Sequence, residues 1–187
     1  MKNRTVDIHA RPDGNGGYDF KMKEGGADKT RLVFDKTQDN MPKNEDYRVF
    51  FKLHNEQNAD LRFSSIPAKV LWAKPIADPS EPCPNCESYM DGIFYLDPSA
   101  TIEKRQITVI NTDPTQQLFA FAMNFVPDGT VEGPDTQYIW FDPIGDNRNG
   151  GFTPPSPGGT SFSLNSPIGM TVIAVVAVVA IAFFLFR

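Results

Sequence analysis

The chain contains few of the residues that most often bind metals. Its 187 residues include two cysteines and two histidines. Both cysteines lie in the motif Cys83-Pro84-Asn85-Cys86, and His9 and His54 are far from it in the sequence. A zinc site at this motif would need two further ligands from those distant histidines. No Ser–His–Asp arrangement, glycine-rich phosphate loop or carboxylate pair is evident either. We therefore expect neither an enzyme nor a bound cofactor.

The cysteine motif still has several interpretations. A Cys-x-x-Cys pair can cycle between dithiol and disulfide, or supply half of a zinc site. Redox catalysis favours a first cysteine at a helix N-terminus, but Cys83 and Cys86 lie in a proline-rich segment. The neighbouring Glu81 and Glu87 disfavour a thiolate. We expect a plain loop, and the alternative is a membrane-tethered redox or metal-binding protein that uses Cys83 and Cys86.

Basic residues are fewer than acidic ones. Up to Arg148 the chain has 17 Lys and Arg against 23 Asp and Glu, a net charge of −6. That charge argues against a nucleic-acid partner, whose phosphates require a positive surface. The first residues, 1–7, contain no apolar core of the kind that a signal peptide needs. We expect the N-terminal domain to lie in the cytoplasm.

One long apolar run stands out at residues 168–186. These nineteen residues carry no charge, and as a helix they would span about 28 Å, close to the ~30 Å core of a bilayer. Ser166 can cap the helix and Pro167 suits its first turn. We predict a single-pass transmembrane helix that anchors the chain in the lipid bilayer. Its anchor positions include Ile168, Gly169, Ala174, Ala177, Phe183, Phe184 and Arg187.

A linker is predicted between this span and the rest of the chain. Residues 149–167 are rich in glycine, proline and serine, carry no charge and show no periodicity. The domains expected are therefore residues 1–148, the linker 149–167 and the transmembrane helix 168–186.

Short segments of alternating apolar and polar residues fill the first 148 positions. Turn residues separate them, and no convincing amphipathic helix occurs, so the pattern predicts about nine strands. We expect an all-β domain, an antiparallel β-sandwich of the immunoglobulin-like or Greek-key kind. The strongest strand contains Phe119, Phe121, Met123 and Phe125 on one face. The other expected inward residues are Val6, Ile8, Ala10, Tyr18, Phe20, Met22, Leu32, Phe34, Tyr47, Val49, Phe51 and Leu53.

Two surface sites follow from the same pattern. Aromatic residues at outward positions concentrate interface energy, and we expect Phe50, Tyr138 and Trp140 to dock on other protein. Asp142, Asp146 and Asn147 could offer oxygen ligands to calcium, but such residues also form turns, which we expect here.

The order of several short motifs resembles the small bacterial DP-EP family. That resemblance implies a β-rich domain from a bacterium and gives no activity. It covers about half of the chain and rests on Leu61-Arg62-Phe63, Asp91-Gly92-Ile93, Val109-Ile110-Asn111-Thr112-Asp113, Phe119-Ala120-Phe121 and Phe141-Asp142-Pro143-Ile144 with Asn147.

Together these features predict a non-enzymatic, tail-anchored accessory or structural subunit of a larger membrane assembly. An energy-transducing complex or a membrane-containing virion would both suit it. Its partners would be other membrane-protein subunits, reached through the β-domain and the helix.

The cysteines should be dispensable. Replacing both (Cys83→Ser with Cys86→Ser) should leave the free energy of unfolding and membrane insertion of the full chain unchanged, because a plain loop adds little to a core. Urea unfolding and metal analysis of the purified chain measure this. A stoichiometric metal that the double variant loses would favour the metal-binding alternative.

Overall fold

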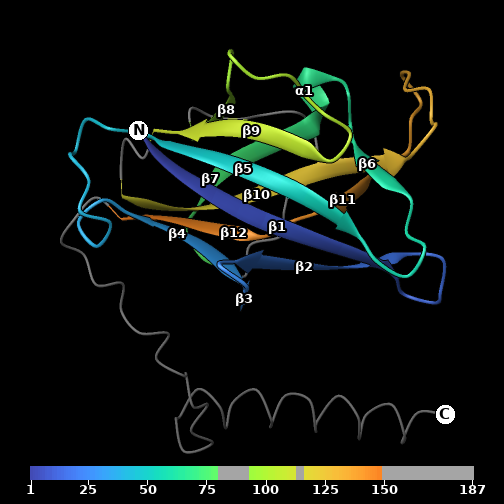
Figure 1. Ribbon diagram of the computed structural model, residues 1–187, viewed down its shortest axis with the longest axis horizontal. Coiled ribbons are helices and arrows are strands. Elements are labelled where there is room, and N and C mark those ends of the chain that lie inside the picture. The colour runs from blue at the N-terminus through green and yellow to red at the C-terminus, as the bar shows by residue number, and fades with distance from the viewer. Residues whose placement is uncertain (80–92, 113–115, 149–187) are drawn as a thin grey trace, which may run out of the picture. The chain divides into compact units, whose positions relative to one another are not determined.

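The computed structural model describes residues 1–79, 93–112 and 116–148 (Figure 1). The described part is all-β, as expected, and contains twelve strands and one four-residue helix. The predicted linker 149–167 and span 168–186, with all the anchor positions, lie outside the described residues, as do Cys83 and Cys86. Within the described ranges no helix is both long and apolar enough to cross a membrane.

The first sheet has six strands in the order β3-β2-β1-β5-β9-β8. We call it sheet A. Its strands are β1 (Lys2–Pro12), β2 (Tyr18–Glu24), β3 (Ala27–Lys29), β5 (Tyr47–Asn55), β8 (Phe94–Leu96) and β9 (Gln106–Asn111).

The second sheet, sheet B, is built around a central strand, β10. β10 pairs with β7 and β6 on one side and with β12 and β11 on the other, and β12 pairs with β4. The strands are β4 (Arg31–Asp35), β6 (Leu61–Phe63), β7 (Leu71–Ile76), β10 (Gln117–Pro127), β11 (Ile139–Phe141) and β12 (Ile144–Arg148), and helix α1 (Pro67–Val70) precedes β7.

Both sheets are mixed, so the expectation of antiparallel pairing throughout was wrong. β1 runs parallel to β5, and β12 runs parallel to β4. Alternation along a strand shows which residues face inward but not which strand lies beside it. The chain leaves sheet A after β3, forms β4 in sheet B and returns to sheet A as β5, and this route produces both parallel pairs.

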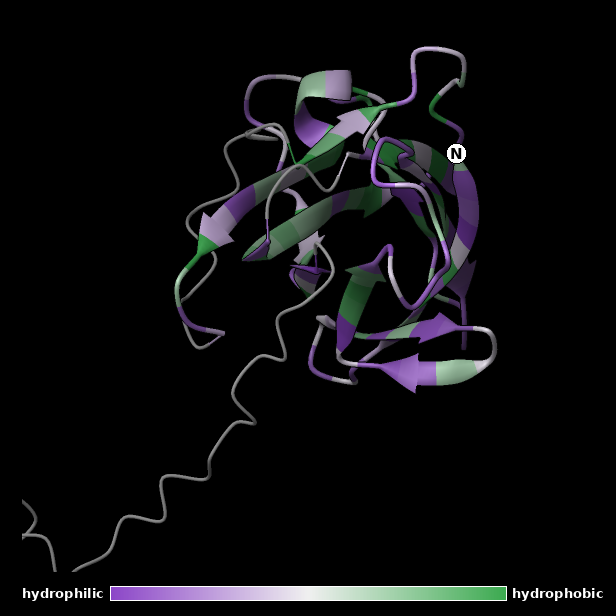
Figure 2. Cartoon of the chain, turned by 90° about the vertical axis from the view of Figure 1, so that its left-hand side faces the viewer, coloured by the Kyte–Doolittle hydropathy of each residue, from purple (hydrophilic) through white to green (hydrophobic). Residues whose placement is uncertain are grey.

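One hydrophobic cluster draws side chains from both sheets. The predicted inward faces of β1 and β5 are confirmed, since Val6, Ile8 and Val49 are fully buried. Tyr18 and Phe20 on β2 are only partly buried against the cluster. Figure 2 shows hydrophobic and hydrophilic residues alternating along the strands. Burial of one face of each strand is the main force that selects this register.

Strand β10 is buried on both faces. Phe119, Phe121 and Phe125 face the main cluster and are fully buried. On the opposite face Ala120 and Ala122 pack with Trp72 and Ile76 of β7, and Leu118 and Ile144 complete this smaller cluster. Every residue from Phe119 to Val126 is buried.

Three elements were not predicted from the sequence: β3, α1 and β12. The turn expected at Asp146 and Asn147 is instead the strand β12, and both residues are buried. Turn-forming residue types misled the prediction because pairing with β4 and β10 overrides their local preference. Pro75 also lies in a strand, β7, whose one described partner is β10, and a strand at a sheet edge tolerates proline.

Phe121→Ala should remove a large part of the domain's stability. Phe121 is fully buried against the Phe51 and Phe94 rings of sheet A, and such a truncation costs about 3–5 kcal/mol. The matched control is Phe50→Ala, the same substitution at a half-buried position on β5, which should cost less than half as much. Urea unfolding of both variants gives the two free energies. Equal losses would show that the inward face of β10 is misassigned.

Candidate functional site

The three expected docking residues do not form one surface. Phe50 lies in β5 of sheet A, half-buried, with Thr5 and Thr108 opposite it on the flanking strands. Trp140 lies in β11 of sheet B, and its side chain is 57% exposed. Tyr138, just before β11, is half-buried with Lys69 5.7 Å above its ring. Trp140 and Tyr138 therefore remain candidates together, without Phe50.

The two histidines lie side by side. Parallel pairing of β1 with β5 places His9 opposite His54, and their rings stack 4.9 Å apart. His9 Nδ1 lies 2.6 Å from Glu56 Oε1, and His54 Nε2 lies 2.8 Å from Asp7 Oδ1. In the described part of the chain no three His, Cys, Asp or Glu side chains are grouped to hold a metal ion. The redox or metal interpretation of Cys83 and Cys86 lies outside the described residues.

The three candidate calcium ligands do not point toward a common position. Adjacent residues of a strand point to opposite faces, so Asp146 and Asn147 face different ways. Asp146 Oδ2 accepts a hydrogen bond from Arg148 Nε at 2.9 Å and lies 3.5 Å from Arg31 Nη1. Asp142 is exposed between β11 and β12. Guanidinium groups surround the one buried carboxylate, which makes it a poor calcium ligand.

Asn147 has a different role, as a bridge between the sheets. Asn111 on β9 donates its Nδ2 hydrogen to Asn147 Oδ1 on β12, at 3.2 Å, and both residues are fully buried. These asparagines come from two of the motifs that resemble the DP-EP family. A buried amide pair costs free energy if either partner is removed, so it fixes the relative position of β9 and β12.

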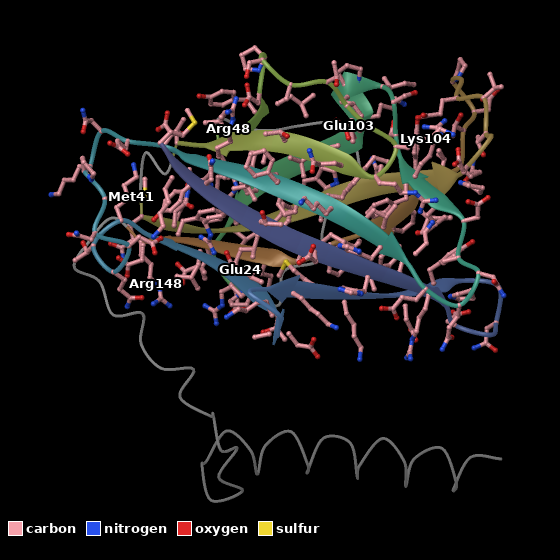
Figure 3. The ribbon with its side chains drawn as sticks, in the orientation of Figure 1. Glu24, Met41, Arg48, Glu103, Lys104 and Arg148 are labelled. Atoms are coloured by element: carbon pink, nitrogen blue, oxygen red, sulfur yellow. The ribbon has the colours of Figure 1, made fainter. Side chains whose placement is uncertain are left out.

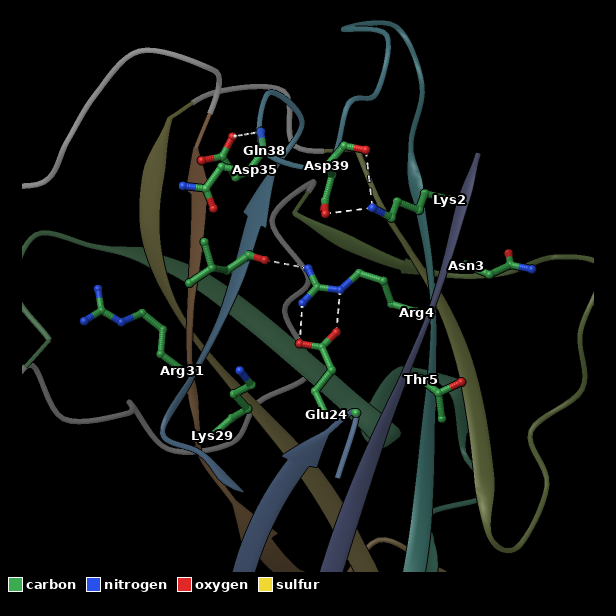
Figure 4. A pocket seen from close by; sticks show the side chains of 12 residues that line it. Lys2, Asn3, Arg4, Thr5, Glu24, Lys29, Arg31, Asp35, Gln38 and Asp39 are labelled. Atoms are coloured by element: carbon green, nitrogen blue, oxygen red, sulfur yellow. Dashed lines mark hydrogen bonds and ion pairs between the residues drawn. The ribbon is translucent and has the colours of Figure 1, made fainter. Parts of the chain in front are cut away.

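A charged groove of about 610 Å³ opens between β1, the β2–β3 hairpin and β4 (Figure 4). Arg4 lies at its centre and is the clearest case of an unexpected inward-facing charge. Its Nε and Nη2 atoms donate to the two carboxylate oxygens of Glu24, each at 2.7 Å, and Nη1 donates to the Val33 carbonyl at 2.6 Å. The guanidinium also lies 4.6 Å from the centre of the Phe34 ring. Arg4 therefore closes this end of the hydrophobic cluster.

The other cations in the groove differ in their partners. Lys2 Nζ donates to Asp39 Oδ1 at 2.7 Å. Burial acts to raise the pKa of Asp39, but hydrogen bonds from Lys2 and the Tyr47 hydroxyl outweigh it and hold the pKa below its usual range. Lys29 and Arg31 lie across the groove, and Figure 4 draws no contact between them and the other lining residues. Only weakly compensated positive charge remains on that side.

A second polar network lies at the far end of the domain, where the segment after β10 folds back on β6. Arg62 and Ser64 are buried, and the Glu132 side chain is 3% exposed. Arg62 Nη1 donates to Glu132 Oε1 at 2.7 Å, and Ser64 Oγ donates to Oε2 at 2.5 Å. The amide and hydroxyl of Ser65 also donate to Oε1, at 2.8 and 2.9 Å.

This network strongly stabilises the ionised form of Glu132. Burial alone would raise the pKa of Glu132, but the hydrogen bonds from Ser64, the Ser65 amide and Arg62 lower it to about 2. A carboxylate with so low a pKa is a weak base at neutral pH, so it suits structure better than proton transfer. No sequence pattern pointed to this network, because Glu132 stands alone among turn residues, 70 positions from Arg62.

Paired charges also lie on both sides of β1 in sheet A. In Figure 3, Glu24 on β2 and Arg48 on β5 lie on opposite sides of β1. Arg48 Nη2 donates to Ser99 Oγ at 2.6 Å and its Nε pairs with Asp97, which fixes the segment after β8. Hydrogen bonds from the hydroxyl and the amide of Ser99 to the Asp97 carboxylate outweigh burial and hold the pKa of Asp97 below its usual range. These charges fasten connecting segments to the sheets.

Comparison with protein-family models and with curated proteins finds no match.

Glu132→Gln should remove one source of acid sensitivity. The folded pKa of about 2 is below the ordinary 4.5, so the carboxylate stabilises the fold above pH 4.5 and this stabilisation is lost as pH falls from 4.5 to 2. The shift corresponds to about 3 kcal/mol at neutral pH. Urea unfolding at pH 7 and pH 3 should show a large difference between wild type and variant that shrinks at pH 3. Glu103→Gln, at an exposed position, is the control. A difference independent of pH would contradict the assignment.

Proposed function

We propose that this chain is a non-enzymatic, single-pass membrane accessory subunit that docks on a partner protein. Residues 1–148 would form an immunoglobulin-like β-sandwich, residues 149–167 a linker and residues 168–186 the anchor. The domain would lie on the cytoplasmic side, and the resemblance to the DP-EP family suggests a bacterial membrane. An energy-transducing complex or a membrane-containing virion remains the expected setting.

The exposed ring of Trp140 is the observation that carries the docking proposal. It is 57% exposed on a three-residue strand, β11, which in the described part of the chain pairs only with β10. Tryptophan is among the residues that contribute most to interfaces, and its exposure costs hydrophobic free energy when no partner is bound. The other strongly exposed aromatic residue of a described strand, Tyr95 (40%), lies on sheet A.

The polar networks also favour a structural role for the domain. Arg4, Arg48 and Arg62 are each held by carboxylates and backbone or hydroxyl oxygens. Each joins a connecting segment or a neighbouring strand to the core. Charges arranged in this way stiffen a scaffold that presents a surface.

Tethering explains how a small docking surface would suffice. A flexible linker of nineteen residues has a root-mean-square length of about 24 Å, so the domain would search a small volume beside its partner. Restricting the search to that volume gives an effective concentration in the millimolar range. A weak contact centred on Trp140 would then be occupied most of the time.

The direct test is to follow the full chain and its Trp140→Ser variant in membranes. Both should resist extraction by alkaline carbonate, because the span is unchanged. In mild detergent the wild type should migrate in an assembly larger than itself, and Trp140→Ser should reduce that fraction about tenfold, as for a residue that dominates an interface. Tyr95→Ser, on sheet A, is the matched control and should have no effect.

Two outcomes would contradict the proposal. Complete extraction by carbonate would mean that residues 168–186 do not anchor the chain. Equal effects of Trp140→Ser and Tyr95→Ser would mean that docking does not depend on β11.

A further inference from the structure

One long side of the domain is a seam where β2 of sheet A faces β4 and β11 of sheet B. β4 lines one half of this seam and β11 the other half. The two halves meet where β4 begins, because Arg31 is opposite Ile144 of β12, just after β11 ends. The halves differ in chemistry, and together they define a surface for an extended ligand.

The β11 half has an open strand edge. β4 continues along β12 only from Ile144 to Arg148, because before Arg31 the chain belongs to β3 in sheet A. No described strand pairs with the outer side of β11. Its outward N–H and C=O groups can therefore pair with an added strand, which would extend the path of β4.

Aromatic side chains line this half from both sheets. Phe20 of β2 stacks 5.4 Å from Phe141 of β11 and 5.2 Å from Phe125 of β10. Phe20, Tyr18 and Phe141 are only partly buried, as is Ile139, whereas the other aromatic rings of the main cluster are buried. The hydrophobic cluster therefore reaches the surface beside the open edge.

The β4 half has positive charge with little compensation. In the groove, Arg4 and Lys2 have carboxylate partners at 2.7 Å. Lys29 has no carboxylate within ion-pair distance among the described residues, and Arg31 reaches Asp146 only at 3.5 Å. Asp146 lies closer to Arg148, at 2.9 Å, so one carboxylate serves two arginines. Lys29 and Arg31 stand where the open edge ends.

We propose that the seam binds an extended acidic peptide segment of a partner protein, which adds as a strand to β11. The segment runs parallel to β11 as β4 does to β12, its apolar side chains cover Phe20 and Phe141, and acidic residues at its carboxyl-terminal end meet Lys29 and Arg31. This rests on the proposed function, because it names the ligand class of the same docking surface.

Other occupants fit less well. The chain's own residues 149–167 contain no acidic residue to complement Lys29 and Arg31. A second copy that paired through its exposed strand β3 would bring its own Lys29 near Arg31, and like charges repel. Acidic peptide from another protein satisfies both halves.

The experiment uses the full chain in detergent micelles and a synthetic eight-residue probe, Thr-Val-Thr-Val-Thr-Val-Glu-Glu. Acrylamide quenches exposed Trp140 and spares buried Trp72, so binding should shield the quenchable fluorescence. Arg31→Glu should weaken binding of the probe about tenfold, because it replaces an attraction with a repulsion. A probe that ends in two lysines should prefer the Arg31→Glu chain. Lys52→Glu, on sheet A, should change nothing.

A probe with alternate N-methylated amides tests the backbone pairing, and it should not bind. The proposal is overturned if no probe shields Trp140 at millimolar concentration, or if the acidic, basic and N-methylated probes bind alike. Self-association of the wild-type chain that the acidic probe displaces would assign the seam to a second copy instead. The measurement needs neither a bilayer nor an assembly, so its failure is distinguishable from failure of the anchoring experiment.

Discussion

Phenylalanine rings from the two sheets interleave, and the rest of the domain depends on that contact. Phe94 of sheet A packs edge-on against Phe119 and Phe121 of β10, with ring centres 5.3 and 5.5 Å apart. Phe51 and Phe34 approach the same rings from their own strands. β10 is buried on both faces. Every other strand of sheet B pairs with β10, except β4, which pairs with β12. The backbone of β12 also lies close to these rings, since a Cβ atom at Gly145 would lie 2.0 Å from the Phe119 ring.

Polar side chains that make hydrogen bonds cover the ends of this hydrophobic core. Arg4 continues the inward row of β1 beyond Val6, and it is tolerated there because Glu24 and the Val33 carbonyl satisfy its donors while Phe34 lies under it. Asn111 and Asn147 do the same between β9 and β12. Lys29 and Arg31, which do not take part in closing the core, lie at the seam. The partly buried rings of Tyr18, Phe20 and Phe141 lie there as well, which is why we propose that docking occurs on this side.

Alternation along the chain was sufficient to predict most of the inward residues. It could not reveal strand partners, so the parallel pairs and the contact of His9 with His54 were missed. β12 was missed because its polar residues, among them Asn147, are buried by contacts distant in sequence. Trp140 was chosen as a docking candidate from its residue type and its expected outward position. The open edge beside it follows only from the pairing of β4 with β12.

Photocrosslinking from the seam tests the central claim most directly. A benzophenone amino acid at position 140 of the full chain, in its own membranes, should crosslink to an extended, acidic segment of one partner protein, identified by mass spectrometry of the linked peptide. The same group at position 52, on exposed Lys52 of β5 in sheet A, should not reach that segment. Equal crosslinking from both positions, or crosslinking from position 140 only to lipid or to a second copy of the chain, would contradict the account.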